Sequence, residues 1–158
     1  MDKILLIDSS NIMEVRKNIS KNQGRKIVLD AKDEEFNRKI METTKKITIF
    51  GFELQDSKDK LRERNSGLNQ VLCKLAKENE ISIGIDLSFL SEYDDKSTSL
   101  LISRIKQNVS LCRKYKVNMA TINANKLNLY DLKAFLLTLG MTTIMVKYAT
   151  DNILILNR

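Results

Sequence analysis

Basic side chains gather in the last third of the chain, where they could bind a polyanion. Residues 101–158 hold nine lysines and arginines against two acidic residues, whereas residues 1–100 hold eighteen of each sign. A one-sided positive surface displaces the counterions condensed on phosphates, which is how proteins bind nucleic acid backbones. The alternative is a solvated helix face without a partner. Because few aromatic residues accompany the basic ones, contacts with backbone and shape are favoured over stacking with bases.

A second candidate phosphate site lies in the polar segment 53–67, which is long for a connection between a strand and a helix. Arg62 and Arg64 precede Ser66, where we expect the next helix to start. Free N–H groups at a helix N-terminus attract anions, and two arginines beside them strengthen that attraction. Alternatively, the arginines pair with carboxylates of their own segment, which are Asp56, Asp59 and Glu63.

The absence of histidine limits the enzymes that this chain could be. It excludes triads with a histidine base, imidazole acid–base catalysis and metal sites with histidine ligands. Mechanisms that use a lysine nucleophile need no histidine, so they remain open. Lys147 follows residues 142–146, an apolar run that predicts a strand. From a strand end, Lys147 could form a Schiff base with a carbonyl substrate, with Glu53 or Asp86 at other strand ends assisting the reaction. A phosphate contact or an ordinary surface lysine are the competing interpretations.

Length and cysteine usage predict one intracellular domain over residues 1–158. The length of 158 residues is typical of a single domain. Cys73 and Cys112 lie 39 residues apart among apolar neighbours, which favours reduced cysteines in or near a core. No apolar run approaches the ~20 residues of a membrane span, and no signal peptide is evident. We therefore expect a cytoplasmic protein that does not associate with membranes.

Apolar runs alternate with amphipathic segments along the whole chain, which predicts an α/β fold with a mainly parallel sheet. Periodicity alone leaves open a doubly wound sheet or a βα barrel, and the barrel would have to be reduced or incomplete at this length. The expected strands cover residues 4–7, 27–29, 47–52, 81–87, 117–122 and 142–146, with a possible seventh at 153–156. The expected helices lie at about residues 12–23, 33–41, 68–76, 99–116 and 128–139.

Several segments of the second and third thirds of the chain carry a family resemblance. They include Asn65-Ser66-Gly67-Leu68-Asn69-Gln70 with the apolar helix that follows, and Cys112-Arg113-Lys114-Tyr115-Lys116-Val117. Further matches lie at residues 81–85, 102–108, 131–132, 139–141 and 147. The chain resembles protein component 3 of archaeal and eukaryotic ribonuclease P, a barrel subunit related to the PHP phosphoesterases. Relative to that family, the resemblance implies a barrel without its first one or two strands.

This resemblance implies a reduced or incomplete (β/α) TIM-like barrel that acts as an RNA-binding, non-catalytic subunit. Such a subunit supports a catalytic RNA that removes 5′ leaders from precursor tRNA. The implied partners are ribonuclease P RNA, precursor tRNA and a small ferredoxin-like protein subunit. No cofactor is expected on the protein itself, and magnesium is expected through the RNA. The candidate RNA-binding residues are Arg62, Arg64, Ser66, Arg104, Arg113, Lys114, Lys116, Lys126 and Lys147. The alternatives are a metal-independent Schiff-base lyase and a general phosphate or nucleotide-binding module.

Overall fold

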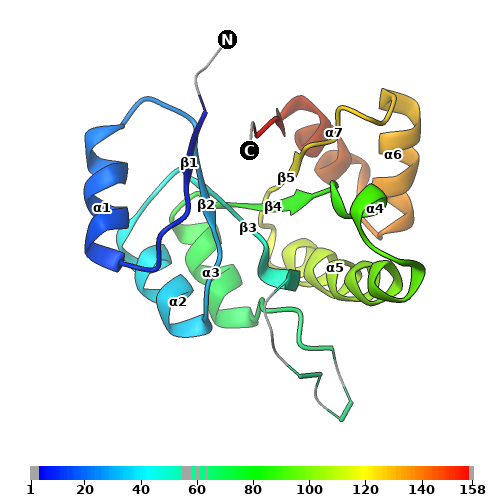
Figure 1. The fold of residues 1–158 in the computed structure, drawn as a ribbon, viewed down its shortest axis with the longest axis horizontal. Helices are drawn as coiled ribbons and strands as arrows, with labels where there is room; N and C mark the ends of the chain where they lie inside the picture. Colours follow the sequence, from blue (N-terminus) through cyan, green and yellow to red (C-terminus); the bar gives the residue numbers. More distant parts are fainter. Residues whose placement is uncertain (1–3, 55–57, 60, 63, 157–158) are drawn as a thin grey trace.

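Six parallel strands form one curved sheet in which every strand pairs with its neighbours in the chain (Figure 1). The computed structural model describes residues 4–54, 58–59, 61–62 and 64–156. This arrangement is an incomplete TIM-like barrel, and it confirms the predicted fold class. The strands are β1 (Leu5–Ile7), β2 (Ile27–Asp30), β3 (Thr48–Phe50), β4 (Ser82–Asp86), β5 (Met119–Ile122) and β6 (Ile153–Leu154).

The helices cover the outer side of this sheet (Figure 1). Most of them begin at a side chain that accepts backbone N–H groups of the first turn, such as Asn11, Asp33 and Asn128. The helices of the described residues are α1 (Ile12–Lys21), α2 (Glu34–Thr43), α3 (Gln70–Glu78), α4 (Phe89–Glu92), α5 (Asp95–Tyr115), α6 (Leu129–Thr138) and α7 (Thr143–Asp151), with the 3₁₀ turn η1 (Phe52–Leu54).

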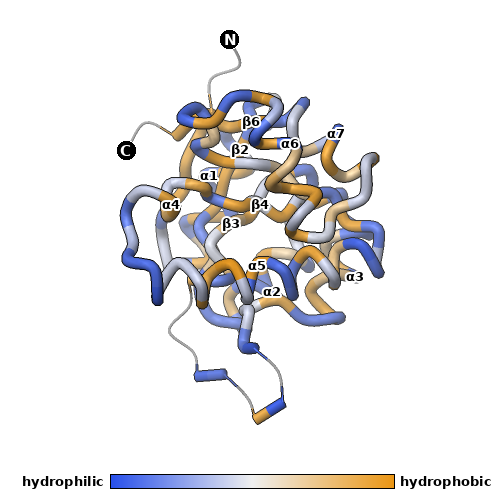
Figure 2. The backbone as a smooth tube through the Cα atoms, turned by 90° about the vertical axis from the view of Figure 1, so that its right-hand side faces the viewer, coloured by the Kyte–Doolittle hydropathy of each residue, from blue (hydrophilic) through white to orange (hydrophobic). Residues whose placement is uncertain are grey.

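Side chains of alternate strand residues build two separate apolar cores. The larger core lies between the sheet and the helices, and it buries both Cys73 and Cys112 as free thiols, as predicted. The smaller core fills the inner, concave side of the sheet. Apolar segments accordingly follow the strands through the interior in Figure 2. The inner core consists of Val28, Phe50, Ala120, Ile122, Leu154 and Leu156.

Gly84 of β4 makes the close packing of the inner core possible. A Cβ atom added there would lie 2.8 Å from both Phe50 Cβ and Ile122 Cδ1. Those two side chains come from the strands on either side of β4, and both lie close to the glycine. The chain's own side chains therefore pack against the concave side of the sheet.

The predicted strand at residues 142–146 is wrong. Gly140 adopts a positive φ of 101° after α6, and the Thr142 hydroxyl accepts the N–H of Met145, so α7 starts at Thr143. The β-branched residues of this run favoured a strand, but Val146 and Ala149 are buried at helical spacing. The helix expected at about residues 99–116 starts earlier, because the polar residues 91–98 contain the end of α4 and the start of α5. The possible last strand is confirmed in shortened form as β6.

Among the described residues, no helix combines the length and the apolar character needed to cross a membrane.

Candidate nucleic-acid interface

The parallel topology sorts the connecting loops into two ends of the sheet. Every helix-to-strand turn lies beside the amino ends of the strands, and every strand-to-helix loop lies beside their carboxyl ends. We call these the amino end and the carboxyl end. Most of the predicted RNA-binding residues divide between these two ends and Lys147 lies within α7, so they do not form one continuous patch.

Arg113, Lys114 and Lys116 lie together at the amino end, in and just after the last turn of α5. All three side chains are exposed. Lys116 closes the helix in the left-handed conformation, with φ of 57°, and Lys114 Nζ lies 5.5 Å from the centre of the Tyr115 ring. Positive charge is favourable at a helix C-terminus, which helps to hold this cluster in place. These three residues can present positive charge to a phosphate backbone.

Arg62 and Arg64 lie at the carboxyl end, in the loop that follows η1. Both are exposed. Arg64 donates to the Asp59 carboxylate at 2.8 Å, so the predicted alternative of a pairing within the loop holds for this arginine. Pairing with Arg64, together with the N–H of Asn65 and the nearby Arg104, holds the pKa of Asp59 below its ordinary value. Asp56 and Glu63, the other predicted partners, lie outside the described residues.

The helix start expected at Ser66 is wrong, because α3 begins four residues later, at Gln70. Gly67 holds a positive φ of 77°, which is not helical, and Asn69 caps the helix by accepting the N–H groups of Val71 and Leu72. Ser66 itself is buried. The contacts of Asn69 satisfy two of the free N–H groups that the phosphate prediction relied on, and the burial of Ser66 keeps it from solvent.

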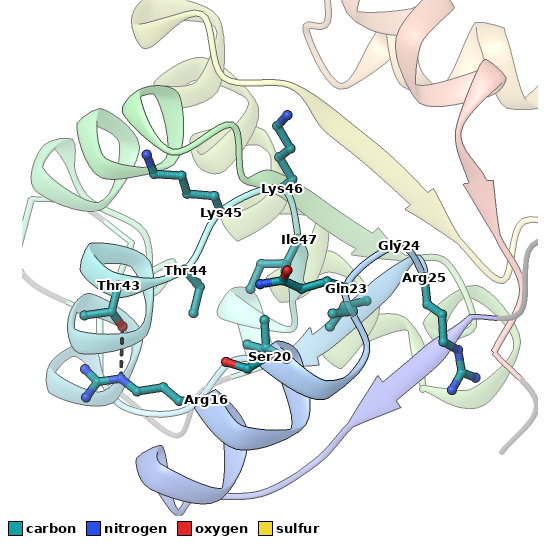
Figure 3. Close-up of a pocket in the computed structure, with 12 residues that line it drawn as sticks. Arg16, Ser20, Gln23, Gly24, Arg25, Thr43, Thr44, Lys45, Lys46 and Ile47 are labelled. Carbon is teal, nitrogen blue, oxygen red and sulfur yellow. Dashed lines mark hydrogen bonds between the residues drawn. The ribbon is translucent and has the colours of Figure 1, made fainter.

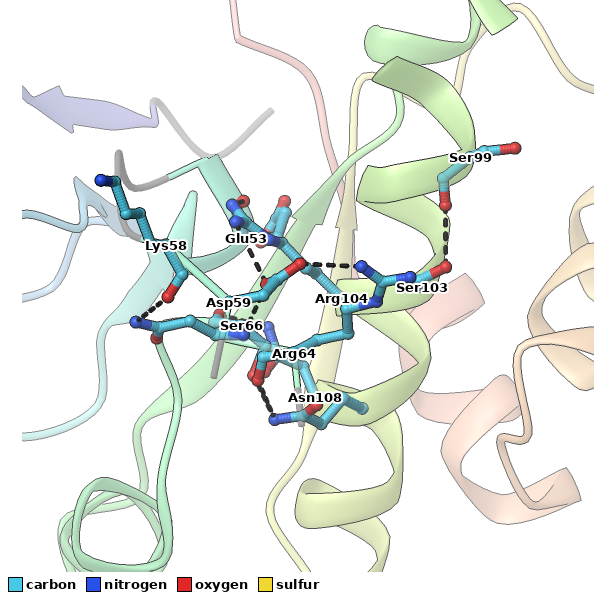
Figure 4. A network of polar contacts seen from close by, with 11 residues as sticks. Glu53, Lys58, Asp59, Arg64, Ser66, Ser99, Ser103, Arg104 and Asn108 are labelled. Atoms are coloured by element: carbon cyan, nitrogen blue, oxygen red, sulfur yellow. Dashed lines mark hydrogen bonds and ion pairs between the residues drawn. The ribbon is translucent and has the colours of Figure 1, made fainter. Parts of the chain in front are cut away.

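Arg104 is buried where α5 meets the loop that follows η1 (Figure 4). We call this loop the carboxyl-end loop. Its guanidinium donates to the backbone carbonyl oxygen of Glu53 at 3.1 Å and lies 3.4 Å from the Asp59 carboxylate. Since Asp59 also holds Arg64, one carboxylate joins the helix to the loop. This geometry favours a structural role for Arg104, whereas its contact with RNA stays a prediction.

Two polar residues one turn further along α5 fix the same loop. Gln107 donates to the carbonyl oxygen of Arg64 at 2.8 Å and to Ser66 Oγ at 3.2 Å, and Asn108 donates to the carbonyl oxygen of Ser66 at 3.1 Å. Sequence reasoning assigned no role to Asn108 or Gln107, and it named Asp59 only as a partner of the loop arginines. The signal was present, because residues 104, 107 and 108 have the i, i+3, i+4 spacing of one helix face beside the apolar stripe.

Lys126 and Lys147 occupy different environments from each other. Lys126 is exposed in the loop after β5, which also lies at the carboxyl end, and it donates to Ser91 Oγ at 3.1 Å. Lys147 lies on α7, with a side chain that is 80% exposed and paired with Asp151 one turn later. The expectation that Lys147 ends a strand is therefore wrong. An exposed, hydrated ammonium group lacks the desolvation that a Schiff-base lysine needs, so the lyase alternative loses its nucleophile.

Acidic side chains also gather at the carboxyl end, which gives this end a mixed charge. Lys32 pairs with both Asp8 and Asp30, and Asp86 accepts the side-chain amide of Asn123 at 3.1 Å. Burial raises the pKa of Glu53 to about 7, with smaller contributions from the nearby Asp86 and Asp30. Glu53 is thus neutral in mildly acidic solution.

Comparison with known proteins gives no matching family model. It does give curated relatives that share one description. Ribonuclease P protein component 3 of Methanosarcina mazei is 35% identical over 82 residues, which are 52% of this chain and 34% of that protein. The protein of the same description from Methanococcus vannielii is 27% identical over 132 residues, which are 82% of this chain and 54% of that protein.

The chain is similar to component 3 of ribonuclease P. It spans about a third to a half of the length of the component 3 proteins that it matches. A chain from a cryo-EM structure of archaeal ribonuclease P with mature tRNA matches 94% of this chain and 63% of its own length, with a TM-score of 0.69 and 21% identity. That match shows the shared fold, and the sequence matches confirm the resemblance to component 3.

Proposed function

We propose that this protein is an RNA-binding subunit of ribonuclease P that supports the removal of 5′ leaders from precursor tRNA. The observation that carries the proposal is the similarity to several component 3 proteins, at up to 39% identity. The incomplete TIM-like barrel that it shares with a chain of an archaeal ribonuclease P structure supports the same assignment.

In this proposal the RNA subunit carries out the cleavage, and Mg²⁺ acts through that RNA. The protein contributes binding and positioning. Its basic amino end, with Arg113, Lys114 and Lys116, neutralises phosphates of the RNA. The exposed position of Lys147 and the lack of histidine leave the protein without the side chains of the enzyme mechanisms considered above. In this proposal the protein itself is a non-catalytic subunit, and it works in the cytoplasm.

The proposed partners are ribonuclease P RNA, precursor tRNA and a small ferredoxin-like protein subunit. The basic amino end favours contact with a folded RNA, because few aromatic side chains are available for stacking with unpaired bases. The small ferredoxin-like subunit would bind a different surface. The loop that follows η1 is a candidate because Arg104 and Asn108 of α5 hold Glu53 and Ser66 near its two ends.

Reconstitution tests the proposal. The protein is mixed with an archaeal ribonuclease P RNA and the small protein subunit, and precursor tRNA cleavage is followed at limiting Mg²⁺. We expect faster cleavage than with RNA and small subunit alone. Unchanged cleavage together with no association with either component would overturn the proposal. Saturable nucleotide binding that hardly depends on salt would instead support a general phosphate-binding module.

A further inference from the structure

A basic groove lies at the amino end, between the C-terminal parts of α1 and α2 (Figure 3). Its volume is about 500 Å³. The lining residues include Arg16, Arg25, Lys45 and Lys46, and none of the twelve is acidic. Ile19, Ile27 and Ile47 are buried beneath it. The groove belongs to the first hundred residues, whose net charge is zero, so the charge balance along the sequence gives no sign of it.

The structure holds the groove in a defined shape. Arg16 of α1 donates through Nε to Thr43 Oγ1 at 3.0 Å and through a terminal nitrogen to the carbonyl oxygen of Lys39 at 3.2 Å, which joins the two helices across the groove. Asn79 donates to the carbonyl oxygen of Met41 at 2.7 Å and so fixes the end of α2. Lys45 and Lys46 follow that helix end and have exposed side chains.

The groove continues into a row of charged turns. The turns before β2, β3, β4 and β5 carry Arg25 with Lys26, Lys45 with Lys46, Glu80, and Lys116, in that spatial order. Four neighbouring strands place these turns along an arc of ~15 Å, since adjacent strands lie ~4.8 Å apart. A second hollow of about 250 Å³ shares Ile27 and Lys46 with the groove. Glu80 is the one acidic residue lining either hollow.

We propose that this groove binds the phosphodiester backbone of the ribonuclease P RNA, as one continuous surface with Arg113, Lys114 and Lys116. The inference rests on the proposed function, and it names the surface that meets the RNA. An extended polyanion suits the geometry because Lys45 and Lys46 stand on the rim and reach toward solvent (Figure 3). A small phosphate compound would need donors that enclose it, whereas half of the lining residues here, Lys45 and Lys46 among them, are exposed.

Binding measurements on the Lys45→Gln, Lys46→Gln double variant test the inference. Affinity for an archaeal ribonuclease P RNA is measured from 50 to 300 mM salt. Because each phosphate contact contributes about one unit to the slope of log K against log salt, we expect the slope to decrease by about one to two units. The Lys45→Arg, Lys46→Arg variant should keep the wild-type slope. The matched control, Lys96→Gln with Lys133→Gln, removes the same charge from exposed positions outside the groove and should change the slope less.

The outcomes separate this inference from the proposed function. A wild-type protein that binds RNA, with a groove variant indistinguishable from the matched control, would overturn the groove and leave the function standing. A lower melting temperature with unchanged RNA affinity would also overturn it, because the lysines would then serve only the helix C-terminus. If the groove variant loses affinity for a nucleoside triphosphate but not for RNA, the groove is a small-molecule site. A wild-type protein without RNA affinity would overturn both proposals.

Discussion

Arg104 on α5 donates to the backbone carbonyl oxygen of Glu53, 51 residues earlier in the chain, at a distance of 3.1 Å. This contact fixes the start of the carboxyl-end loop against the long helix. The same guanidinium lies beside Asp59, which holds Arg64 and the N–H of Asn65. The loop that could carry Arg62 and Arg64 to a phosphate is therefore positioned by a buried arginine.

Replacing Arg104 should destabilise the protein more than replacing an exposed arginine. We expect Arg104→Ala to cost about 2 to 4 kcal/mol, because the Glu53 carbonyl loses its buried donor and Asp59 loses one of its two arginine partners. Arg113→Ala on the same helix is the control and should stay within about 0.5 kcal/mol. Urea unfolding of both variants gives the comparison. Equal stabilities would show that the Arg104 contacts contribute little to the fold.

Glu53 should make stability depend on pH. Its pKa of about 7 in the folded protein lies above the value of 4.5 for a free side chain, so folding binds a proton between these values. The stability contributed by this group is complete below pH 4.5 and is lost as pH rises to about 7. The free energy of unfolding decreases by about 3 kcal/mol over this pH range.

The Glu53→Gln variant removes this titration. It should match the wild type near pH 5 and exceed its free energy of unfolding near pH 8, which urea unfolding at the two pH values measures. Glu42→Gln, an exposed carboxylate on α2, is the control and should show no such difference. A constant offset between Glu53→Gln and wild type across this pH range would contradict the prediction.

Gly67 should tolerate alanine less well than Gly24. Both glycines have positive φ angles, of 77° and 97°, so alanine costs about 1 to 2 kcal/mol of backbone strain at each. At Gly67 the added Cβ would also lie 2.2 Å from the carbonyl oxygen of Phe52, whereas nothing lies within 4 Å at Gly24. We expect thermal unfolding to show a further loss of about 2 kcal/mol for Gly67→Ala. Equal melting temperatures would mean that the loop shifts at no cost.

Charge reversal at the end of α5 should weaken RNA binding. In the Arg113→Glu, Lys114→Glu variant, two cations become anions on an exposed surface, so the fold stays intact while the salt dependence of binding becomes shallower. Filter binding to ribonuclease P RNA at several salt concentrations measures this slope, with Lys96→Glu, Lys133→Glu as the matched control. An unchanged slope would place the RNA elsewhere.

The sequence predicts local elements well and tertiary relationships poorly. The first five strands and the cores of the helices that follow them are confirmed, because each has its own apolar period and cap. Residues 142–146 were misread because a short β-branched run fits a strand as well as a helix. The Asp59–Arg104 pair joins residues 45 positions apart, so no local pattern reveals it. The charge counted along the chain does not reveal the basic groove either, because the groove is formed jointly by the turns before β2 and β3.

The strand order β1 to β6 follows the chain without a crossing. As a consequence, each βα unit depends mainly on the units before and after it, as in a repeat protein. Such a sheet can gain or lose whole units at β1 or β6, its two edges within the described part of the chain, without changing the register of the remaining pairs. Proteins of different lengths can then share one basic end, because every added unit brings its own helix-to-strand turn to that same end.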